Sequence, residues 1–355
     1  MVREMIIDGR KVGPEGPPFV VAELSGNHNG EIERAFEIIA AAKQAGASAV
    51  KLQTYTADTI TIDSDRADFV VDMPLWKDRT LHDLYQEAHT PWDWHEALFA
   101  KGKALGITVF SSPFDPTAVD FLETLGAPAY KIASFELVDI PLIEKVAATG
   151  KPVIMSTGMG SLDEIEDAVS AARGAGCSEL ALLHCVSAYP TPFDQANLAN
   201  IGVLAERFDV TVGLSDHTLG TVVPVAATAL GAVIIEKHLT LSRADGGVDS
   251  AFSLEPHELK QLVDDVAIAA ATGAGPNFGA KEAEADSLNY RRSLYVVADM
   301  KAGECFTESN VRSIRPGFGL PPKHLKAVLG KTASRALKRG EPLALDMIVG
   351  GKDMQ

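Results

Sequence analysis

The sequence predicts an α/β protein built as a (β/α)8 TIM barrel with a small domain after it. Short apolar runs rich in β-branched residues alternate eight times with amphipathic segments whose apolar residues recur every three or four positions. Glycine ends several of these segments just before the next apolar run, as it does at helix C-termini. Apolar residues make up 46% and charged residues 23% of the 355 residues, which excludes a disordered chain.

The predicted elements follow one another in a regular order. Residues 5–12 predict a small hairpin that turns at Asp8-Gly9. We expect the eight barrel strands at 19–23, 49–53, 107–112, 129–134, 152–157, 180–185, 211–217 and 233–238. Amphipathic helices are expected to include 31–44, 92–105 and 162–173. The glycines that end helices are Gly46, Gly106, Gly126, Gly150, Gly176 and Gly231.

A doubly wound open sheet is the structural alternative. Nucleotide-binding members of that class carry a glycine-rich turn after the first strand. Here residues 23–30 read Glu-Leu-Ser-Gly-Asn-His-Asn-Gly, which is neither G-x-G-x-x-G nor a P-loop. The number of strands also favours the barrel.

The rest of the chain predicts a lid and a second domain. Residues 54–90 are too many for a plain β–α loop and are expected to form a lid or side wall of the site. Small residues after position 270 indicate a linker. We therefore expect a barrel domain at 1–275, a linker at 276–290 and a second domain at 291–355, with β-like runs at 293–297 and 344–349.

Charge and cysteine content exclude several kinds of partner. The net charge of −16 would repel nucleic acid and anionic lipid, although a few local cations could still bind a small anion. Cys177, Cys185 and Cys305 show no C-x-x-C spacing and indicate a reducing compartment. The N-terminal residues lack an apolar leader, and the apolar stretch at 222–235 is too short to span a bilayer. We expect a cytoplasmic, soluble protein with no membrane partner.

Polar residues gather where the predicted strands end, which is the active-site face of such a barrel. The strand ends carry, in order, Glu23; Lys51 and Gln53; Ser111 and Ser112; Lys131, Ser134 and Glu136; His184, Ser187 and Tyr189; Ser215, Asp216 and His217; and Glu236, Lys237 and His238. Alternation along a strand then sorts them by face. Lys51 and Gln53 share one face, as do Glu236 and His238, whereas Lys237 is expected on the helix side.

These residue types predict a metal site next to an anion site. His217 and His238 end adjacent strands and could hold one divalent ion, although two hydrogen-bonded core histidines would look the same. Two cations and four hydroxyls suit a phosphate group: Lys51, Lys131, Ser112, Ser134, Ser187 and Ser215. Glu23 beside them could be a general base or an ion-paired structural carboxylate.

The ordered motifs of the chain resemble the sialic acid synthase family. They are residues 22–30, Lys51-Leu-Gln53, 110–115, 130–136, 156–159, 184–190, 213–218, Glu236-Lys-His238 and Arg315-Pro-Gly317. The resemblance covers essentially the whole chain. It implies a barrel with a C-terminal antifreeze-like (SAF) domain, and a homodimer that exchanges this domain. It also implies condensation of phosphoenolpyruvate with an amino-sugar aldehyde to a nine-carbon 2-keto acid and phosphate.

The resemblance also implies roles for single residues. The serines and lysines of the anion site would bind phosphoenolpyruvate, and His217 and His238 would hold Mn²⁺ or Mg²⁺. Glu23 would handle the attacking water. The sugar would contact Gln53, Glu136, Tyr189 and Asp249, and Arg315 would come from the partner's SAF domain.

Details of the motifs look most like the pseudaminic acid synthase branch. These details are Glu23-Leu-Ser-Gly26, Ala133-Ser-Phe-Glu136, residues 249–256 and 291–295. That branch implies 2,4-diacetamido-2,4,6-trideoxy-L-altrose as the aldehyde and pseudaminic acid as the product. An N,N'-diacetyllegionaminate or N-acetylneuraminate synthase is the alternative. A metal-dependent pyruvate aldolase would share the barrel and the ion but would not need the phosphate cluster. A non-enzymatic sugar- or ice-binding protein would leave the polar strand ends unexplained.

Overall fold

The computed structural model describes residues 3–72, 76–273 and 275–354, which belong to two compact units, Met1–Ala274 and Gly275–Gln355. The boundary between a linker at 276–290 and a domain at 291–355 stays a prediction. No helix within the described residues is both long and apolar enough to cross a membrane.

The first unit is a closed parallel barrel. Its strands are β3 (Phe19–Glu23), β4 (Ala49–Thr54), β5 (Thr108–Pro113), β6 (Tyr130–Ile132), β7 (Val153–Ser156), β8 (Leu180–Cys185), β9 (Thr211–Asp216) and β10 (Ile234–His238). The strands pair in chain order, and β10 closes the barrel against β3. The predicted fold class and all eight predicted strands are therefore confirmed within the described residues.

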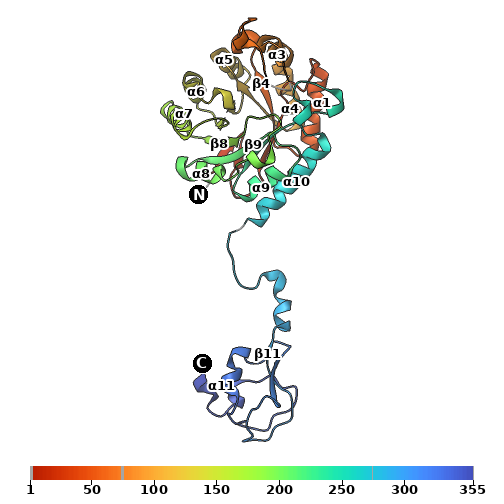
Figure 1. Cartoon of the computed structure of the whole chain (residues 1–355), viewed down its shortest axis with the longest axis vertical. Helices are drawn as coiled ribbons and strands as arrows, with labels where there is room; N and C mark the ends of the chain where they lie inside the picture. The colour runs from red at the N-terminus through yellow and green to blue at the C-terminus, as the bar shows by residue number, and fades with distance from the viewer. Residues whose placement is uncertain (1–2, 73–75, 274, 355) are drawn as a thin grey trace. The chain divides into compact units, whose positions relative to one another are not determined.

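Helices surround the strands (Figure 1). They are α1 (Ile32–Ala45), α4 (His95–Leu105), α5 (Pro116–Thr124), α6 (Ile140–Ala147), α7 (Leu162–Gly174), α8 (Asn200–Phe208), α9 (Val222–Ala229) and α10 (Pro256–Thr272). Local sequence signals fix their ends. Ser161 and Glu164 form a capping box at the start of α7, and Gly46 ends α1 with a left-handed φ of 89°.

The barrel interior has an apolar layer that is covered from below by the N-terminal hairpin. Strands β1 (Met5–Ile7) and β2 (Arg10–Val12) pair around Asp8 and Gly9, both with positive φ, as predicted. Met5, Ile7 and Val12 pack against inward-facing strand residues such as Phe19 and Phe110. Because side chains alternate along a strand, the residues two positions further on face the interior above this layer.

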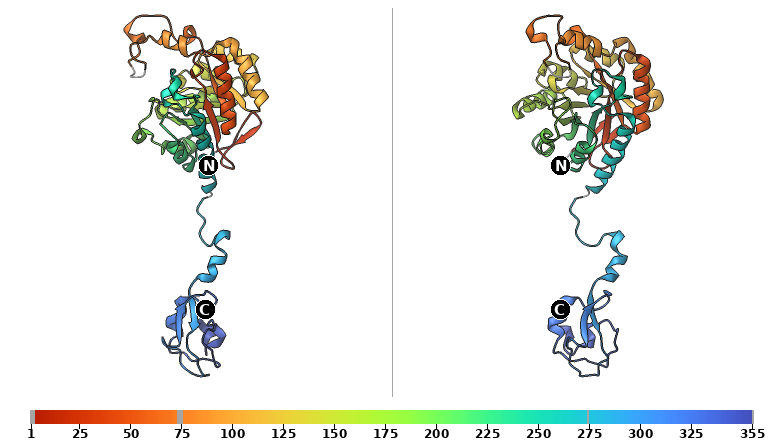
Figure 2. Two further views of the ribbon diagram at one scale, coloured as in Figure 1. Left: turned by 90° about the vertical axis from the view of Figure 1, so that its right-hand side faces the viewer. Right: turned by 45° about the vertical axis from the view of Figure 1, so that its right-hand side comes forward.

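The long segment between β4 and α4 lies at the opposite end of the barrel from this hairpin (Figure 2). It contains α2 (Ala57–Ile60) and α3 (Leu81–Ala88), while residues 73–75 of the predicted lid lie outside the described residues. Trp76 fastens the segment to loops that follow other strands. Its Nε1 donates to the backbone oxygen of Val248 at 3.0 Å, and its ring lies 5.8 Å from that of Tyr189, centroid to centroid.

The second unit is a small fold with its own core. Strands β11 (Ser293–Val296) and β12 (Val311–Ile314) form an antiparallel pair, and α11 (Leu325–Val328) is short. Its buried core includes Leu294, Phe306 and Leu343. The predicted β-like run at 293–297 is confirmed, but the one at 344–349 is wrong. There Leu345–Met347 forms a 3-10 turn, and Ile348 makes an isolated antiparallel bridge to Ala333 that is too short to form a strand.

Candidate active site

The inward-facing residues above the apolar layer form a buried polar cluster. Alternation from Val21, Ala49 and Ala129 brings Glu23, Lys51 and Lys131 to the interior. The same alternation brings Ser112, Ser215 and Glu236 there from the other strands. All six are buried at the carboxyl ends of the strands, where barrel enzymes carry out their chemistry.

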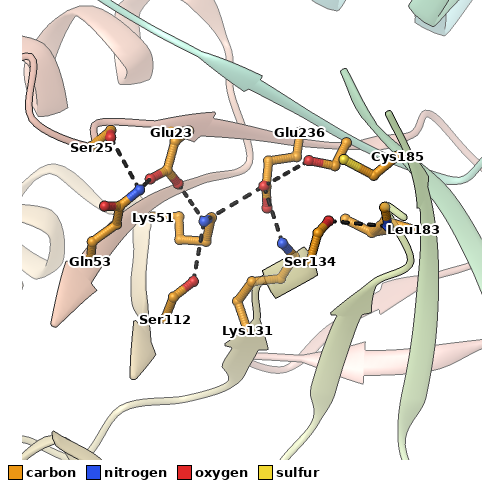
Figure 3. Close-up of polar contacts among 12 residues, drawn as sticks. Glu23, Ser25, Lys51, Gln53, Ser112, Lys131, Ser134, Leu183, Cys185 and Glu236 are labelled. Carbon is orange, nitrogen blue, oxygen red and sulfur yellow. Dashed lines mark hydrogen bonds and ion pairs between the residues drawn. The ribbon is translucent and has the colours of Figure 1, made fainter. Parts of the chain in front are cut away.

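At the centre of this cluster, the positive charges of two lysines are compensated by the negative charges of two glutamates (Figure 3). Lys51 Nζ lies 2.7 Å from Glu23 Oε2 and 3.6 Å from Glu236 Oε1, and it donates to Ser112 Oγ at 3.2 Å. Lys131 Nζ lies 3.3 Å from Glu236 Oε1. The cluster thus holds two cations ready for an anion while remaining neutral without one.

The two glutamates differ in protonation. Burial raises the pKa of Glu23 to about 7, although the Lys51 ammonium opposes the shift. Glu236 is equally buried, but Lys131 and Lys51 together lower its pKa to about 2. Glu23 is therefore the carboxyl of the pair that exchanges a proton near neutral pH.

Hydroxyl groups line the side of the cluster next to Lys131. Ser134 Oγ accepts from the backbone N–H of Gly158 at 3.2 Å, and Ser134 begins the 3-10 turn that follows β6. A Cβ at position 158 would lie 2.3 Å from Ser187 Oγ and 2.7 Å from Ser134 Oγ. Glycine is thus required for the two serines to approach the same point.

Two histidines lie side by side at the ends of β9 and β10. Their ring centroids are 5.4 Å apart, and Phe252 packs against both rings. Nδ1 of His217 lies 3.0 Å from the carbonyl oxygen of Val186. Because a carbonyl only accepts, Nδ1 carries a proton, and Nε2 is the nitrogen left to bind a metal. Burial opposes the charged form, but the neighbouring Cys185 raises the pKa of His217, so a metal at Nε2 would displace a proton. Burial and the neighbouring His217 hold the pKa of His238 well below its usual range, so this ring is neutral.

The histidine pair fits a divalent ion that water and substrate oxygens would complete. Nδ1 of His238 is buried without a hydrogen-bond partner among the described residues, and Asp249 Oδ2 lies 3.7 Å from it. Neutral imidazoles with a free nitrogen are the form that binds metal. The described part of the chain contains no group of three or more histidine, cysteine or acidic side chains arranged to hold a metal ion.

A further set of polar groups continues from Glu23 toward the loops. Gln53 Nε2 donates to Glu23 Oε1 at 3.0 Å and to Ser25 Oγ at 3.1 Å, and Ser25 donates to Asp249. Tyr189 packs its ring 4.4 Å from that of His217, centroid to centroid. Glu136 is partly buried, and burial raises its pKa to about 7. These groups could contact an uncharged, hydroxyl-rich or amide-bearing substrate.

Other residues that the sequence analysis names lie outside this cluster. The ring of His184 bonds the carbonyl oxygen of Ala196 at 2.7 Å and does not join the cluster. Lys237 pairs with Asp216 on the helix side of the sheet, as alternation predicted. Arg315 is exposed and belongs to the second unit.

Three residues received no role in the sequence analysis, although alternation along their strands places them inside the barrel. Glu236 receives hydrogen bonds from Lys131 and Ser215, the latter at 3.1 Å. Cys185 Sγ lies 3.9 Å from His217 Nδ1, and Ser156 Oγ is buried without a partner among the described residues. The contact between Trp76 and Tyr189 could not have been predicted in this way, because no local sequence pattern relates the two residues.

A parallel barrel whose mouth holds paired lysines, serine hydroxyls and a histidine pair defines a (β/α)8 enzyme that acts on an anionic substrate. The comparisons with known proteins identify it further. The chain belongs to the NeuB family, whose model matches residues 38–276, and a SAF domain matches residues 291–349.

Known relatives cover nearly the whole chain. A pseudaminic acid synthase of Helicobacter pylori is 44% identical over 334 residues, which are 94% of this chain and 98% of the relative. An N,N'-diacetyllegionaminic acid synthase of Campylobacter jejuni is 36% identical and covers 91% of this chain and 97% of its own length. The crystal structure of an N-acetylneuraminic acid synthetase of Leptospira borgpetersenii, in complex with citrate, has a TM-score of 0.73 at 31% identity, over 81% of this chain and 96% of that one.

Proposed function

We propose that the chain is a pseudaminic acid synthase. It condenses phosphoenolpyruvate with 2,4-diacetamido-2,4,6-trideoxy-L-altrose and water, and it releases pseudaminic acid and phosphate. The observation that carries this proposal is the convergence of Lys51 and Lys131 with serine hydroxyls in a buried barrel mouth. The reaction itself comes from the pseudaminic acid synthases that the chain resembles at 43–44% identity.

Phosphoenolpyruvate carries two anionic groups, and the cluster has donors for both. We assign its binding to Lys51, Ser112, Lys131, Ser134, Ser187 and Ser215. Charge-assisted hydrogen bonds from buried ammonium groups are strong because little water screens them. Phosphoenolpyruvate is an activated enol, so no lysine needs to form a Schiff base.

Glu23 is the proposed base for the water that adds to C2. Its pKa of about 7 means that a large share of the carboxyl is ionised at neutral pH and able to accept a proton. Gln53 and Lys51 hold the two oxygens of this carboxylate at 3.0 and 2.7 Å. C3 attacks the aldehyde carbon, water adds to C2, and the adduct loses phosphate together with its bridging oxygen. The lysines and serines stabilise the departing dianion.

We assign a divalent ion, Mn²⁺ or Mg²⁺, to His217 and His238. The unpartnered Nδ1 of His238 supports this assignment, as does the orientation of His217, whose Nδ1 is bound to the carbonyl oxygen of Val186 and whose Nε2 is left for a ligand. Bound there, such an ion would polarise the aldehyde oxygen of the sugar. Gln53, Glu136, Tyr189 and Asp249 are assigned to the sugar.

We further propose that the chain works in the cytoplasm as a homodimer. The second unit of each chain would dock on the partner's barrel and bring Arg315 to its mouth. The charges of the two units support this arrangement: residues 275–355 hold 13 Lys and Arg against 9 Asp and Glu, whereas residues 1–274 hold 19 against 39. A net charge of +4 and one of −20 attract each other.

Phosphate release tests the proposed function. Phosphoenolpyruvate is offered with the trideoxy-altrose, its legionaminate-type stereoisomer and N-acetylmannosamine. We expect the highest kcat/KM for the first sugar, loss of turnover with a chelator, and recovery with Mn²⁺ or Mg²⁺. Turnover of pyruvate in place of phosphoenolpyruvate would favour the aldolase instead. Preference for another sugar would identify a different synthase of the family.

A further inference from the structure

Glu236 is a buried charged group of the cluster to which the proposed mechanism assigns no role. It lies on β10 with about 5% of its surface exposed. Three donors converge on one of its oxygens, Oε1: Lys51 Nζ at 3.6 Å, Lys131 Nζ at 3.3 Å and Ser215 Oγ at 3.1 Å. The other oxygen, Oε2, is buried without a hydrogen-bond partner among the described residues.

Two ammonium groups and a hydroxyl around one oxygen form the arrangement that a phosphoryl oxygen requires. Figure 3 shows the carboxyl of Glu236 between the amino groups of Lys51 and Lys131. The donors that we assign to phosphoenolpyruvate are thus already bound to an anion that belongs to the protein. A phosphate that binds them must share or replace the contacts of this carboxylate.

We propose that Glu236 is a resident counter-anion that limits the affinity of the site for phosphate. Without substrate, its carboxylate keeps Lys51 and Lys131 charged, desolvated and close together. With substrate, it stands within a few ångströms of the phosphate dianion and repels it. Once the C–O bond has broken, the same carboxylate reoccupies the lysines and speeds the release of phosphate. This inference rests on the proposed function, and it assigns Glu236 as a positioning residue.

A purely structural role for Glu236 makes the opposite prediction. If the carboxylate served only to hold the lysines in place, its loss would misplace them and weaken phosphate binding. If it competes with phosphate, its loss strengthens phosphate binding. A unit charge removed from this distance in a buried site changes anion affinity by at least about tenfold. The direction of the change therefore separates the two roles.

The test measures the binding of inorganic phosphate and of phosphoenolpyruvate by calorimetry in the full chain, without turnover. The variants are Glu236→Gln and a matched control, Glu166→Gln, which removes an exposed carboxylate that pairs with Arg207 on the outside of the barrel. We expect the Kd for phosphate to fall at least about tenfold in Glu236→Gln and to stay unchanged in the control. Phosphate should also raise the Tm of Glu236→Gln more than that of the unmodified chain, because binding restores an anion to the unpaired lysines.

In turnover, Glu236→Gln should lower the KM for phosphoenolpyruvate, lower kcat and strengthen inhibition by phosphate. A folded Glu236→Gln that binds phosphate equally or more weakly overturns the inference. If that variant does not fold, Glu236→Asp replaces it, since the shorter side chain keeps the charge but withdraws from Lys131. Glu236→Asp should bind phosphate a few-fold tighter than the unmodified chain, and equal or weaker binding would again overturn the inference. If the unmodified chain binds neither phosphate nor phosphoenolpyruvate, the proposed function falls as well.

Discussion

His28 and His95 are buried next to the barrel mouth, and the hydrogen bonds around each ring favour the neutral form. Nδ1 of His28 accepts from the backbone N–H of Gly30 at 3.0 Å, so its proton is on Nε2. In His95 the roles are reversed, since Nδ1 donates to the carbonyl oxygen of Pro91 at 3.1 Å and Nε2 pairs with Thr54 Oγ1 at 2.8 Å. Burial lowers the pKa of both rings to about 4. A second proton would break the bond that His28 accepts from Gly30, and in His95 it would force the hydroxyl of Thr54 to accept from the ring.

These histidines predict a loss of barrel stability in mild acid. Their pKa is about 6.5 in the unfolded chain and about 4 in the folded one, so the unfolded state takes up protons first. The contribution of these histidines to the free energy of unfolding should therefore be constant above pH 6.5 and be lost between pH 6.5 and 4, by up to about 3 kcal/mol per ring. The raised pKa of Glu23 and of Glu136 acts in the opposite direction, so the histidine contribution is measured as a difference between variants. Denaturant unfolding followed by tryptophan fluorescence measures it for this unit alone, because all three tryptophans are at 76–94. The difference in the free energy of unfolding between the unmodified chain and a His95→Gln variant isolates the contribution of this ring. It should fall between pH 6.5 and 4, and a difference that does not depend on pH would contradict the assignment.

Glu23 predicts the pH dependence of turnover. A base must be ionised, so kcat/KM should rise with pH through about 7 and level off above it. Glu23→Gln should lower kcat by about 10²–10⁴-fold, because the attacking water loses its base. Glu136 is the control, since its pKa is also raised to about 7. In Glu136→Gln, the kcat/KM of the residual activity should still fall below pH 7. If that fall disappears in this variant, Glu136 is the base instead of Glu23.

At the scale of elements, the segment at 54–90 depends on contacts that are remote in sequence. Trp76 joins it to Val248 and Tyr189, which follow β10 and β8. Val71, Leu84 and Val248 form a small apolar cluster beneath it, and Trp76 packs against them. The ring thus connects the segment to Tyr189, a residue of the proposed sugar site.

Removing this ring should weaken the binding of the sugar more than the binding of phosphoenolpyruvate. Trp76→Ala should raise the KM for the sugar about tenfold, because an aromatic contact and a hydrogen bond are lost together. Trp76→Phe keeps a ring and should lose less. Steady-state kinetics with each substrate varied in turn measure the effect. An equal rise in both KM values would mean that the segment supports the whole mouth and not the sugar side.

The sequence predicts the elements whose signals are local and misses those that depend on partners far along the chain. The barrel strands combine apolar runs with glycine-ended helices, and alternation along each strand then assigns Lys51, Lys131 and Ser215 to one cluster. Strand β12 reads Val-Arg-Ser-Ile, and only Val311 is fully buried, so its pairing with β11 has no local signal. The convergence of three donors on Glu236 likewise depends on closure of the barrel, which brings β4, β6, β9 and β10 together.

At the scale of the whole molecule, the uneven distribution of charge matters most. The second unit carries a net charge of +4 and the first a net charge of −20. Within the first unit, the segment 54–90 holds eight aspartates and glutamates, and its arginines and lysines are at 66, 77 and 79. Salt screens such long-range attraction beyond about 10 Å at 0.1 M ionic strength. If charge helps the second unit to dock on a barrel, raised salt should increase the KM for the sugar before it affects the fold.

Mixing two impaired variants tests whether that barrel belongs to a partner chain. His217→Ala removes a proposed metal ligand from the barrel, and Arg315→Ala removes the arginine that the second unit would contribute. In a C2 dimer with exchanged second units, a mixed dimer has one site that combines an intact barrel with an intact arginine. Equal amounts denatured and refolded together make about half of the dimers mixed, so about a quarter of the unmodified activity should return at low sugar concentration. Each variant refolded alone is the control. If Arg315 serves its own barrel, the mixture will be no more active than the average of its two parents, and the exchanged dimer is then wrong.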